Sequence, residues 1–260
     1  MTTTYLDKIL ESHRRSAAAD GRRSGDLFAE SRALPPCRDF AGALRAPGLS
    51  VIAEVKRRSP SKGDLAADLD PAAVALEYES GGAACLSVLT DVDHFGGSAA
   101  DLQAARAAVG LPVLRKDFTV SINDVYDTRL MGADCVLLIV AALDDAELAE
   151  FGAAAAGVGL TALFEIHDEA ELERALAVDA QVIGVNQRDL VTFEVDQERA
   201  VRMAPLIPAD RVRVAESGVR GPDDARVLRQ AGYDAVLVGE SVVTAAGRAG
   251  AVRALREAHG

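Results

Sequence analysis

The sequence predicts a (β/α)8 or TIM barrel, an α/β fold in which eight parallel strands alternate with eight helices. After residue 50, short runs rich in β-branched residues alternate at regular spacing with stretches rich in Ala, Leu, Arg and Glu. Eight such pairs fit in a chain of 260 residues, 49% of them hydrophobic, and this length is typical of the barrel. No glycine fingerprint for dinucleotides follows the first strand, which favours a closed barrel over an open sheet.

The expected strands lie near residues 51–56, 84–89, 112–116, 134–139, 160–165, 182–186, 212–216 and 235–238. The helices that follow them are expected near residues 71–81, 98–109, 121–132, 144–157, 168–178, 196–204, 222–231 and 248–258. Three of these helices have recognisable start signals, which are Asp70-Pro71, Ser121 before Asn123-Asp124, and Gly221-Pro222.

Residues 1–50 precede the first strand, and we expect them to form an N-terminal helical extension that packs on the barrel. A helical pattern covers residues 5–18 and roughly 39–44, and Gly25 and Pro35-Pro36 separate the two. No linker or low-complexity tract interrupts the sequence. We therefore expect residues 1–260 to form a single domain.

Composition argues against several classes of partner. The formal net charge of -12 and the pI near 4.8 argue against nucleic-acid and membrane partners, because the negative field would repel them. The three cysteines, Cys37, Cys85 and Cys135, lack metal-like spacing and are expected to be buried thiols in a reducing compartment. No apolar run approaches the roughly 20 residues needed to span a bilayer, and the N-terminus has no apolar signal core. We expect a monomeric, cytoplasmic protein.

The first predicted strand carries two opposite charges on a face that should be buried. Side chains alternate along a strand, so Ile52, Glu54 and Lys56 share one face, and buried charges are costly unless paired or used. A basic, hydroxyl-rich loop follows, with Arg57, Arg58, Ser59, Ser61 and Lys62. Such a cluster in an acidic chain indicates a specific anion site. The alternative is an internal ion pair at a strand end beside a solvated run of charge.

Polar side chains also stand at the carboxyl ends of other predicted strands, where barrels of this type carry their chemistry. The six candidates are Glu54, Lys56, Lys116, Glu165, Asn186 and Glu216. An apolar residue stands two positions before a polar strand end, as Leu163 does before Glu165. Residues two positions apart share a strand face, so the polar side chain should point into the barrel as the apolar one does. Each polar side chain alone is compatible with a solvated strand terminus, but the set of six predicts an active site.

A phosphate site is expected at the loops after the seventh and eighth strands, where barrels commonly bind phosphate through backbone N–H groups. These loops contain Ser217, Gly218, Gly239 and Glu240, and Ser59 can add a hydroxyl from the first loop. The Glu240 carboxylate would repel phosphate, so only its backbone N–H is expected to help. Without the barrel, the two glycines would be ordinary turn residues. The first loop, from residue 57 to roughly 70, exceeds the usual length of about two to six residues, which indicates a lid.

Six segments together form a specific set of motifs, namely AEVKRRSPSKG (53–63), LRKDF (114–118), FEIHD (164–168), GVNQRDL (184–190), AESGV (215–219) and LVGES (237–241). They resemble the indole-3-glycerol phosphate synthase family of tryptophan biosynthesis, and the resemblance covers nearly the whole chain. The segments around Ser59 and Asn186 are the most specific. Departures are small: Gln187 stands where Asn is common, Phe164 replaces a smaller residue, and the tail after residue 241 is less typical.

The resemblance implies a small phosphorylated substrate, 1-(2-carboxyphenylamino)-1-deoxyribulose 5-phosphate, which closes to an indole with loss of CO2 and water. It implies that Lys116 is the general acid of ring closure and that Glu165 accepts the proton removed in dehydration. Lys56 is either the second acid or the group that holds the substrate carboxylate. Which lysine serves which step is left open.

The remaining candidates have supporting roles under the same resemblance. Glu54 would stabilise a cationic intermediate, Asn186 would hold a substrate hydroxyl, and Glu216 would steer the lysines or the sugar hydroxyls. Apolar candidates for the aryl pocket are Phe95, Phe118 and Leu137, and the polar lining is completed by Arg188 and Ser217. No step needs a metal or a redox cofactor, so we expect neither, and the histidines are scattered at His13, His94, His167 and His259.

Two other classes of function stay open at this point. A related barrel isomerase, acting on phosphoribosyl aminoaldoses, would share the phosphate site but would not need Lys56 and Lys116 together. A non-catalytic protein that retains an old phosphate site would be expected to have lost its buried charges. Indole fluorescence on mixing with the arylamino-ribulose phosphate separates the three classes, and the absence of Trp keeps the background low.

Overall fold

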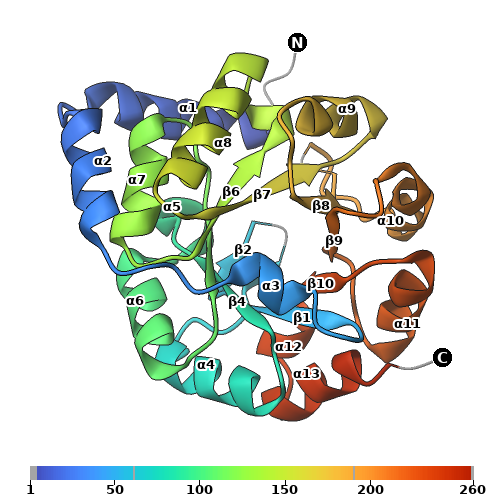
Figure 1. Cartoon of the computed structure of the whole chain (residues 1–260). Coiled ribbons are helices and arrows are strands. Elements are labelled where there is room, and N and C mark those ends of the chain that lie inside the picture. The colour runs from blue at the N-terminus through green and yellow to red at the C-terminus, as the bar shows by residue number, and fades with distance from the viewer. Residues whose placement is uncertain (1–4, 61, 190, 259–260) are drawn as a thin grey trace.

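The computed structural model describes residues 5–60, 62–189 and 191–258, and its centre is a closed ring of eight parallel strands (Figure 1). In chain order these are β1 (Ser50–Val55), β4 (Cys85–Leu89), β5 (Val113–Lys116), β6 (Cys135–Ile139), β7 (Thr161–Ile166), β8 (Val182–Asn186), β9 (Val212–Glu216) and β10 (Ala235–Val238). Each strand pairs with the next one along the chain, and β10 pairs back with β1, where Ser50 lies opposite Ala235. The predicted (β/α)8 barrel is confirmed.

Helices cover the outside of the ring (Figure 1). They are α4 (Pro71–Ser80), α6 (Ala99–Ala108), α7 (Ile122–Leu130), α8 (Asp145–Gly157), α9 (Glu169–Ala177), α10 (Gln197–Met203), α11 (Pro222–Ala231) and α13 (Arg248–Arg256). The predicted start signals are confirmed: Asp70 caps α4, Ser121 forms a capping box with Asp124, and Pro222 opens α11. Observed bounds differ from the predicted ones by at most two residues, and some elements agree at both ends.

Three helices precede the barrel, α1 (Tyr5–Ala19), α2 (Ser24–Ala33) and α3 (Phe40–Leu44). The prediction of a break at Gly25 is wrong, because this glycine is the second residue of α2. A glycine in a helix interior costs about 1 kcal/mol relative to alanine, which is an upper limit for this position in the first turn. Packing offsets this cost, since Leu27 is buried and the Phe28 ring lies 5.8 Å from the Tyr126 ring of α7. Pro35-Pro36 lies beyond the end of α2, as predicted.

Strand side chains alternate between two hydrophobic layers. Outward residues pack under the helices, whereas inward residues such as Ile52 and Leu163 fill the barrel. Phe40 and Leu44 of α3 are fully buried in the inner layer. The Phe40 carbonyl lies 3.8 Å from Sγ of Cys85, the first residue of β4, so α3 lies at the amino end of the strands. The carboxyl end is therefore the end available for a site.

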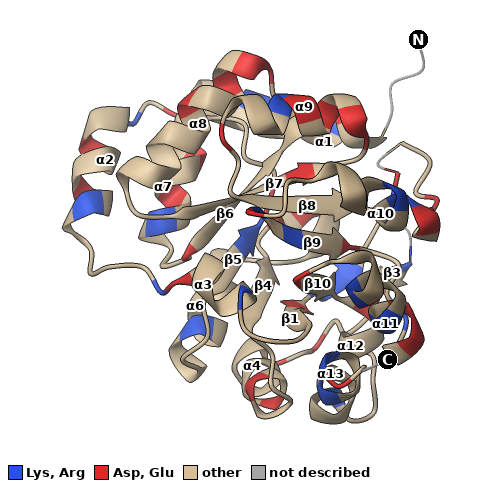
Figure 2. Ribbon diagram, turned by 45° about the vertical axis from the view of Figure 1, so that its right-hand side comes forward, with Lys and Arg blue, Asp and Glu red and all other residues tan. Residues whose placement is uncertain are grey.

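Charged residues lie both on the outer helices and on some strands of the ring. Lys and Arg are interspersed with Asp and Glu over the outer helices, and charged segments also mark strands β1, β5 and β7 (Figure 2).

No helix in the described part of the chain is both long enough and apolar enough to cross a membrane. The three cysteines are free thiols, and Cys85 and Cys135 are buried as predicted, whereas Cys37 is half-buried.

Candidate active site

A cavity of about 570 Å³ lies at the carboxyl ends of the strands. Both sets of candidates line it, the six at strand ends and the nine expected to bind substrate. The second set is Ser59, Phe95, Phe118, Leu137, Arg188, Ser217, Gly218, Gly239 and Glu240. Of the predicted basic loop, Lys62 also lines the cavity, and Ser61 lies outside the described residues. The barrel thus gathers residues from across the chain into one place.

Glu54 and Lys56 form an ion pair at the end of β1, with Lys56 Nζ 2.7 Å from Glu54 Oε1. The other carboxylate oxygen of Glu54 accepts a hydrogen bond from Ser87 Oγ on β4 at 3.2 Å. Gly239, which follows β10, leaves room for the pair, because a Cβ there would stand 2.4 Å from Glu54 Oε1 and 2.9 Å from Lys56 Nζ. This glycine is thus needed for space at its Cα.

Lys116, at the end of β5, lies between two buried carboxylates. Its Nζ is 2.6 Å from Glu165 Oε2 and 3.4 Å from Glu216 Oε2. The Asn186 side-chain amide donates to the other oxygen of Glu165 at 3.1 Å. Gly184 makes room for Glu216, since a Cβ there would stand 2.0 Å from Glu216 Oε1. Four strands therefore present one ammonium, two carboxylates and one amide to a single point.

Burial and neighbouring charges set the protonation of this cluster. Burial opposes the charge of Lys116, but Glu165 and Glu216 outweigh it and raise the Lys116 pKa above its ordinary value. Burial also works against an ionised Glu165, yet the adjacent Lys116 holds the pKa of that carboxyl below its usual range. At Glu216 burial dominates and, helped by the Glu165 charge, raises the pKa to about 8. At neutral pH the cluster therefore contains a charged lysine, an ionised Glu165 and a protonated Glu216.

The loops after β9 and β10 bring backbone to the cavity. Ser217 and Gly218 both have left-handed backbone, with φ of 64° and 73°, a conformation that is easy for glycine. The short helix α12 (Glu240–Val243) begins directly after Gly239, and the first N–H groups of a helix have no partner within it. The Glu240 carboxylate lies 3.6 Å from Lys62 Nζ of the first loop. These features give the cavity one end suited to an anion.

Aromatic and aliphatic side chains form another part of the cavity wall. The rings of Phe95 and Phe118 are 6.3 Å apart, and the buried side chain of Leu137 lines the same cavity. Helix α1 adds Tyr5 and Ile9, which sequence reasoning missed. The amphipathic pattern of α1 indicated a packed helix, but no local signal placed that helix over the strand ends.

The long first loop forms a small hairpin of β2 (Arg58–Ser59) and β3 (Gly63–Asp64). Its base is fixed by Arg57, whose guanidinium donates two hydrogen bonds of 2.8 and 2.9 Å to Asp101 of α6. Arg58 donates to the carbonyls of Val92 and Asp93 in the short helix α5 (Val92–Phe95). The expectation that both arginines belong to the anion site is therefore wrong, because protein partners already engage them outside the cavity.

Arg188 and its neighbours order the loop after β8. The Arg188 guanidinium donates to the Phe193 carbonyl at 3.0 Å, and its backbone N–H donates to Asn186 Oδ1 at 3.0 Å. The latter contact orients the Asn186 amide so that its nitrogen faces the glutamate cluster. Gln187, at a position where the sequence departs from its family, donates to the Ser217 carbonyl at 2.8 Å and so ties this loop to the next.

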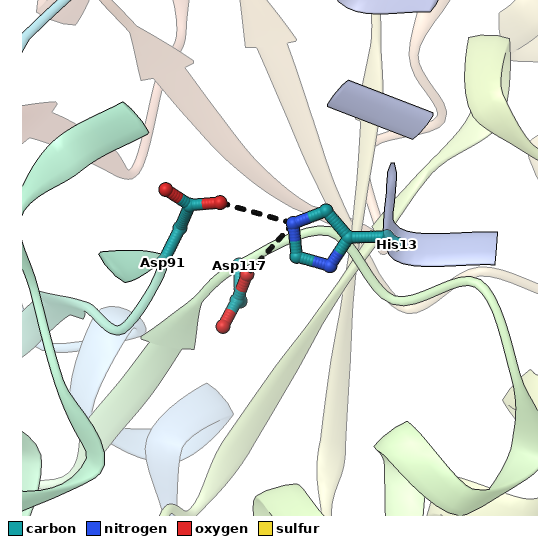
Figure 3. Close-up of side chains that lie close together, drawn as sticks. All are labelled: His13, Asp91 and Asp117. Carbon is teal, nitrogen blue, oxygen red and sulfur yellow. Dashed lines mark hydrogen bonds and ion pairs between the residues drawn. The ribbon is translucent and has the colours of Figure 1, made fainter. Parts of the chain in front are cut away.

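A histidine of α1 meets two aspartates at the cavity rim (Figure 3). His13 Nε2 lies 3.0 Å from Asp91 Oδ2 and 3.9 Å from Asp117 Oδ1. The three side chains are close enough to share a metal ion, and His13 is the one histidine among them. Both carboxylates already have protein partners, because Asp91 caps α5 and Asp117 accepts a 3.0 Å hydrogen bond from Arg115. We call these three residues the α1 clasp, an ion-paired contact between α1 and the strand ends.

A (β/α)8 barrel with lysine–glutamate pairs at its strand ends belongs to the class of acid–base barrel enzymes. More specifically, the chain belongs to the indole-3-glycerol phosphate synthase family, whose sequence model matches residues 6–255.

Curated relatives carry the same family name. The indole-3-glycerol phosphate synthase of Nocardioides sp. strain JS614 is 53% identical over 255 residues, which cover 96% of this chain and 97% of that protein. Indole-3-glycerol phosphate synthase 1 of Streptomyces coelicolor is 53% identical over 243 residues, covering 93% and 90%. Among solved structures, thiamine phosphate pyrophosphorylase from Pyrococcus furiosus superimposes with a TM-score of 0.62 at 16% identity, covering 83% of this chain and 96% of that one. This last likeness is one of fold alone.

Proposed function

We propose that this protein closes 1-(2-carboxyphenylamino)-1-deoxyribulose 5-phosphate to indole-3-glycerol phosphate with loss of CO2 and water, as a carboxy-lyase of tryptophan biosynthesis. The observation that carries the proposal is the presence of two lysine–glutamate pairs in one cavity. Lys116 lies 2.6 Å from Glu165, and Lys56 lies 2.7 Å from Glu54. Membership of the family supports the same reaction.

Ring closure needs an acid at the substrate ketone, because a neutral ketone is a poor electrophile for an aromatic carbon. We assign this step to Lys116, whose ammonium is kept charged chiefly by the ionised Glu165 at 2.6 Å. The proton moves from Nζ to the ketone oxygen as the new carbon–carbon bond forms. Loss of CO2 then leaves the bonding electron pair in the ring and restores its aromaticity.

Dehydration needs a base that removes a proton and an acid that protonates the departing hydroxyl. Glu165 suits the base, since it is ionised and buried at the same point as Lys116. Lys56 is the second acid or the group that holds the substrate carboxylate. Glu54, paired with Lys56, would stabilise the positive charge that develops on the intermediate.

The rest of the cavity is assigned to binding. Asn186 holds a substrate hydroxyl, and Glu216 steers Lys116 or the sugar hydroxyls. The phosphate is assigned to Ser59, Ser217, Gly218, Gly239 and the backbone of Glu240, and the aryl ring to Phe95, Phe118 and Leu137, with Arg188 in the polar lining. A cavity with an anion-binding end and an aromatic wall fits a substrate that has a phosphate at one end and an aryl ring at the other.

The test is to mix the purified protein with the arylamino-ribulose phosphate and follow indole fluorescence, which a chain without Trp does not obscure. We expect fluorescence to appear with the natural chain and to be strongly reduced with Lys116→Ala. Conversion of a phosphoribosyl aminoaldose without indole formation would instead identify a barrel isomerase. No reaction with either compound would leave a non-catalytic protein.

We further propose that residues 1–260 are one domain, that the protein acts as a monomer in the cytoplasm, and that it needs no cofactor and no nucleic-acid or membrane partner. The three free thiols and the net charge of -12 support these assignments.

A further inference from the structure

Beside Glu165 stands a histidine that the reaction as described does not use. His167 follows β7 directly, and its Nε2 lies 3.8 Å from Glu165 Oε1, the carboxylate oxygen that does not contact Lys116. The Nε2 atom is buried and makes no hydrogen bond with any described residue. Buried polar atoms without a partner are uncommon in folded proteins. Its place next to Glu165 therefore needs a reason.

The opposite side of the imidazole is firmly anchored. His167 Nδ1 lies 3.0 Å from Glu171 Oε2 of α9, and the same oxygen accepts the His167 backbone N–H at 2.8 Å. An ionised carboxylate can only accept hydrogen bonds, so Nδ1 carries a proton. Glu171 therefore orients the ring and directs Nε2 toward Glu165.

The charges around His167 favour its protonated form. Burial opposes the charge, and so does Arg199 of α10, but Glu171 of α9 and Glu165 of β7 outweigh both and raise the His167 pKa. A protonated ring places a positive charge at the Oε1 side of Glu165. Lys116 supplies the positive charge at the Oε2 side. With His167 protonated, Glu165 would be flanked by two cations.

The second cation matters because Lys116 does not stay charged through the reaction. Once Lys116 has given its proton to the ketone, it is neutral, and Glu165 loses its main counter-ion before the dehydration step. A buried carboxylate without a counter-ion takes up a proton easily, and a protonated Glu165 cannot act as a base.

We propose that protonated His167, held by Glu171, is a positioning residue that keeps Glu165 ionised and oriented for the dehydration step. This inference rests on the proposed role of Glu165 as proton acceptor. The proposed role explains why Nε2 of His167 has no hydrogen-bond partner among the described residues, because a fixed partner would draw the Nε2 proton away from Glu165.

The first test is the pH dependence of turnover. In His167→Asn the amide nitrogen can still reach Glu171, while the group that faces Glu165 is removed. We expect the acid limb of kcat to move up by about 0.5–1 pH unit, kcat at pH values below that limb to fall by up to about 10-fold, and KM to change little. Glu171→Gln should move the same limb in the same direction. The matched control is Glu169→Gln, an exposed residue of the same helix for which no hydrogen bond or ion pair to His167 is seen, and it should leave the limb in place.

The second test does not depend on activity. The His167 imidazole is titrated by NMR in the natural chain and in Glu165→Gln, with His167→Asn used to assign its signal. Because the coupling of two charges is reciprocal, we expect the His167 pKa to fall by about 0.5 unit or more when the Glu165 charge is removed. An unchanged titration, or a loss of kcat in His167→Asn with an unmoved acid limb, overturns the inference even if the protein makes indole. Full turnover by Glu165→Gln would instead refute the proposed role of Glu165.

Discussion

His13 of α1 and Asp91, which follows β4, form an ion pair with an Nε2–Oδ2 distance of 3.0 Å although they are 78 positions apart in the chain. The same aspartate caps α5 by accepting the backbone N–H groups of His94 and Phe95. The side chain of Phe95 lines the cavity, and Tyr5 of α1 contacts His94 through a 3.0 Å hydrogen bond. The N-terminal extension is therefore part of the wall of the site and is connected to it by the α1 clasp.

The α1 clasp makes stability depend on pH in a defined direction. Burial lowers the pKa of His13, but Asp91 and Asp117 outweigh it, so the pKa in the folded protein is raised. The contribution of His13 to the free energy of unfolding is therefore complete below its unfolded-state pKa of about 6.5. It is lost as the pH rises through the pKa of His13 in the folded protein. Burial opposes the ionised form of Asp91, yet His13 and the N–H groups that Asp91 caps lower the Asp91 pKa. The contribution of ionised Asp91 to the free energy of unfolding is therefore lost only as the pH falls through that lowered pKa.

We predict that His13→Val lowers the free energy of unfolding by about 1–2 kcal/mol at pH 6 and by less at pH 9. Urea denaturation at the two pH values measures the difference. Asp91→Asn is the control, because it keeps an oxygen to cap α5 but removes the charge, and it should flatten the pH dependence in the same way. An equal loss at both pH values would mean that His13 contributes only by packing, for example against the Phe118 ring at 5.5 Å.

Replacing Lys116 should abolish most of the chemistry while sparing binding. We expect Lys116→Ala to lose at least about 100-fold in kcat and to bind a product analogue nearly as well as the natural chain. Steady-state kinetics and analogue titration give the two quantities. Lys62→Ala is a matched charge loss at the cavity rim and should keep kcat within a few-fold. A nearly normal kcat for Lys116→Ala would show that another group is the acid.

How much the sequence predicts depends on whether a residue's position follows from local periodicity. The meeting of Glu165 and Glu216 in one site could be predicted, because strand alternation and barrel closure fix where inward-pointing side chains at strand ends lie. The contact of His13 with Asp91 could not, since it depends on how α1 docks across the strand ends. Arg57 was assigned to the wrong place for a similar reason, because its partner Asp101 lies on another helix.

The protonation of Glu216 predicts the basic limb of activity. Its pKa is raised to about 8, chiefly by burial, so above that pH a second negative charge appears 3.4 Å from Lys116. That charge makes Lys116 a weaker acid. We expect kcat of the natural chain to decline above about pH 8, and Glu216→Gln, which mimics the protonated form, to lack this decline. Superimposable basic limbs in the two proteins would assign the decline to another group.

Gly239 is predicted to be needed for activity more than for folding. A methyl group there would meet Glu54 Oε1 at 2.4 Å and Lys56 Nζ at 2.9 Å, which are both terminal side-chain atoms. Gly239→Ala should therefore displace the ion pair and lower kcat by about 10-fold or more, while the free energy of unfolding changes little. Gly250→Ala on α13, where a Cβ meets nothing within 4 Å, is the control and should be as active as the natural chain. Equal activity of both variants would show that Glu54 and Lys56 tolerate displacement.

The hairpin loop after β1 is predicted to couple phosphate binding to chemistry. Its base is fixed, because Arg57 contacts Asp101 and the Leu65 N–H donates to the Arg57 carbonyl at 2.8 Å, whereas Ser59 and Pro60 line the cavity. A bound phosphate that engages Ser59 would hold the loop closed, exclude water and keep Lys56 in register.

Pro60→Gly should weaken this coupling, since a more flexible loop populates the closed state less. If closure serves only to grip phosphate, the variant raises KM alone. If closure also orders the catalytic groups, kcat falls as well, and this combined effect is the outcome we expect. Steady-state kinetics are to be paired with protease protection of the loop in the presence and absence of a substrate analogue. A pure KM effect without ligand-dependent protection would restrict the loop to phosphate binding, because a lid that orders Lys56 must change kcat when its closed population changes.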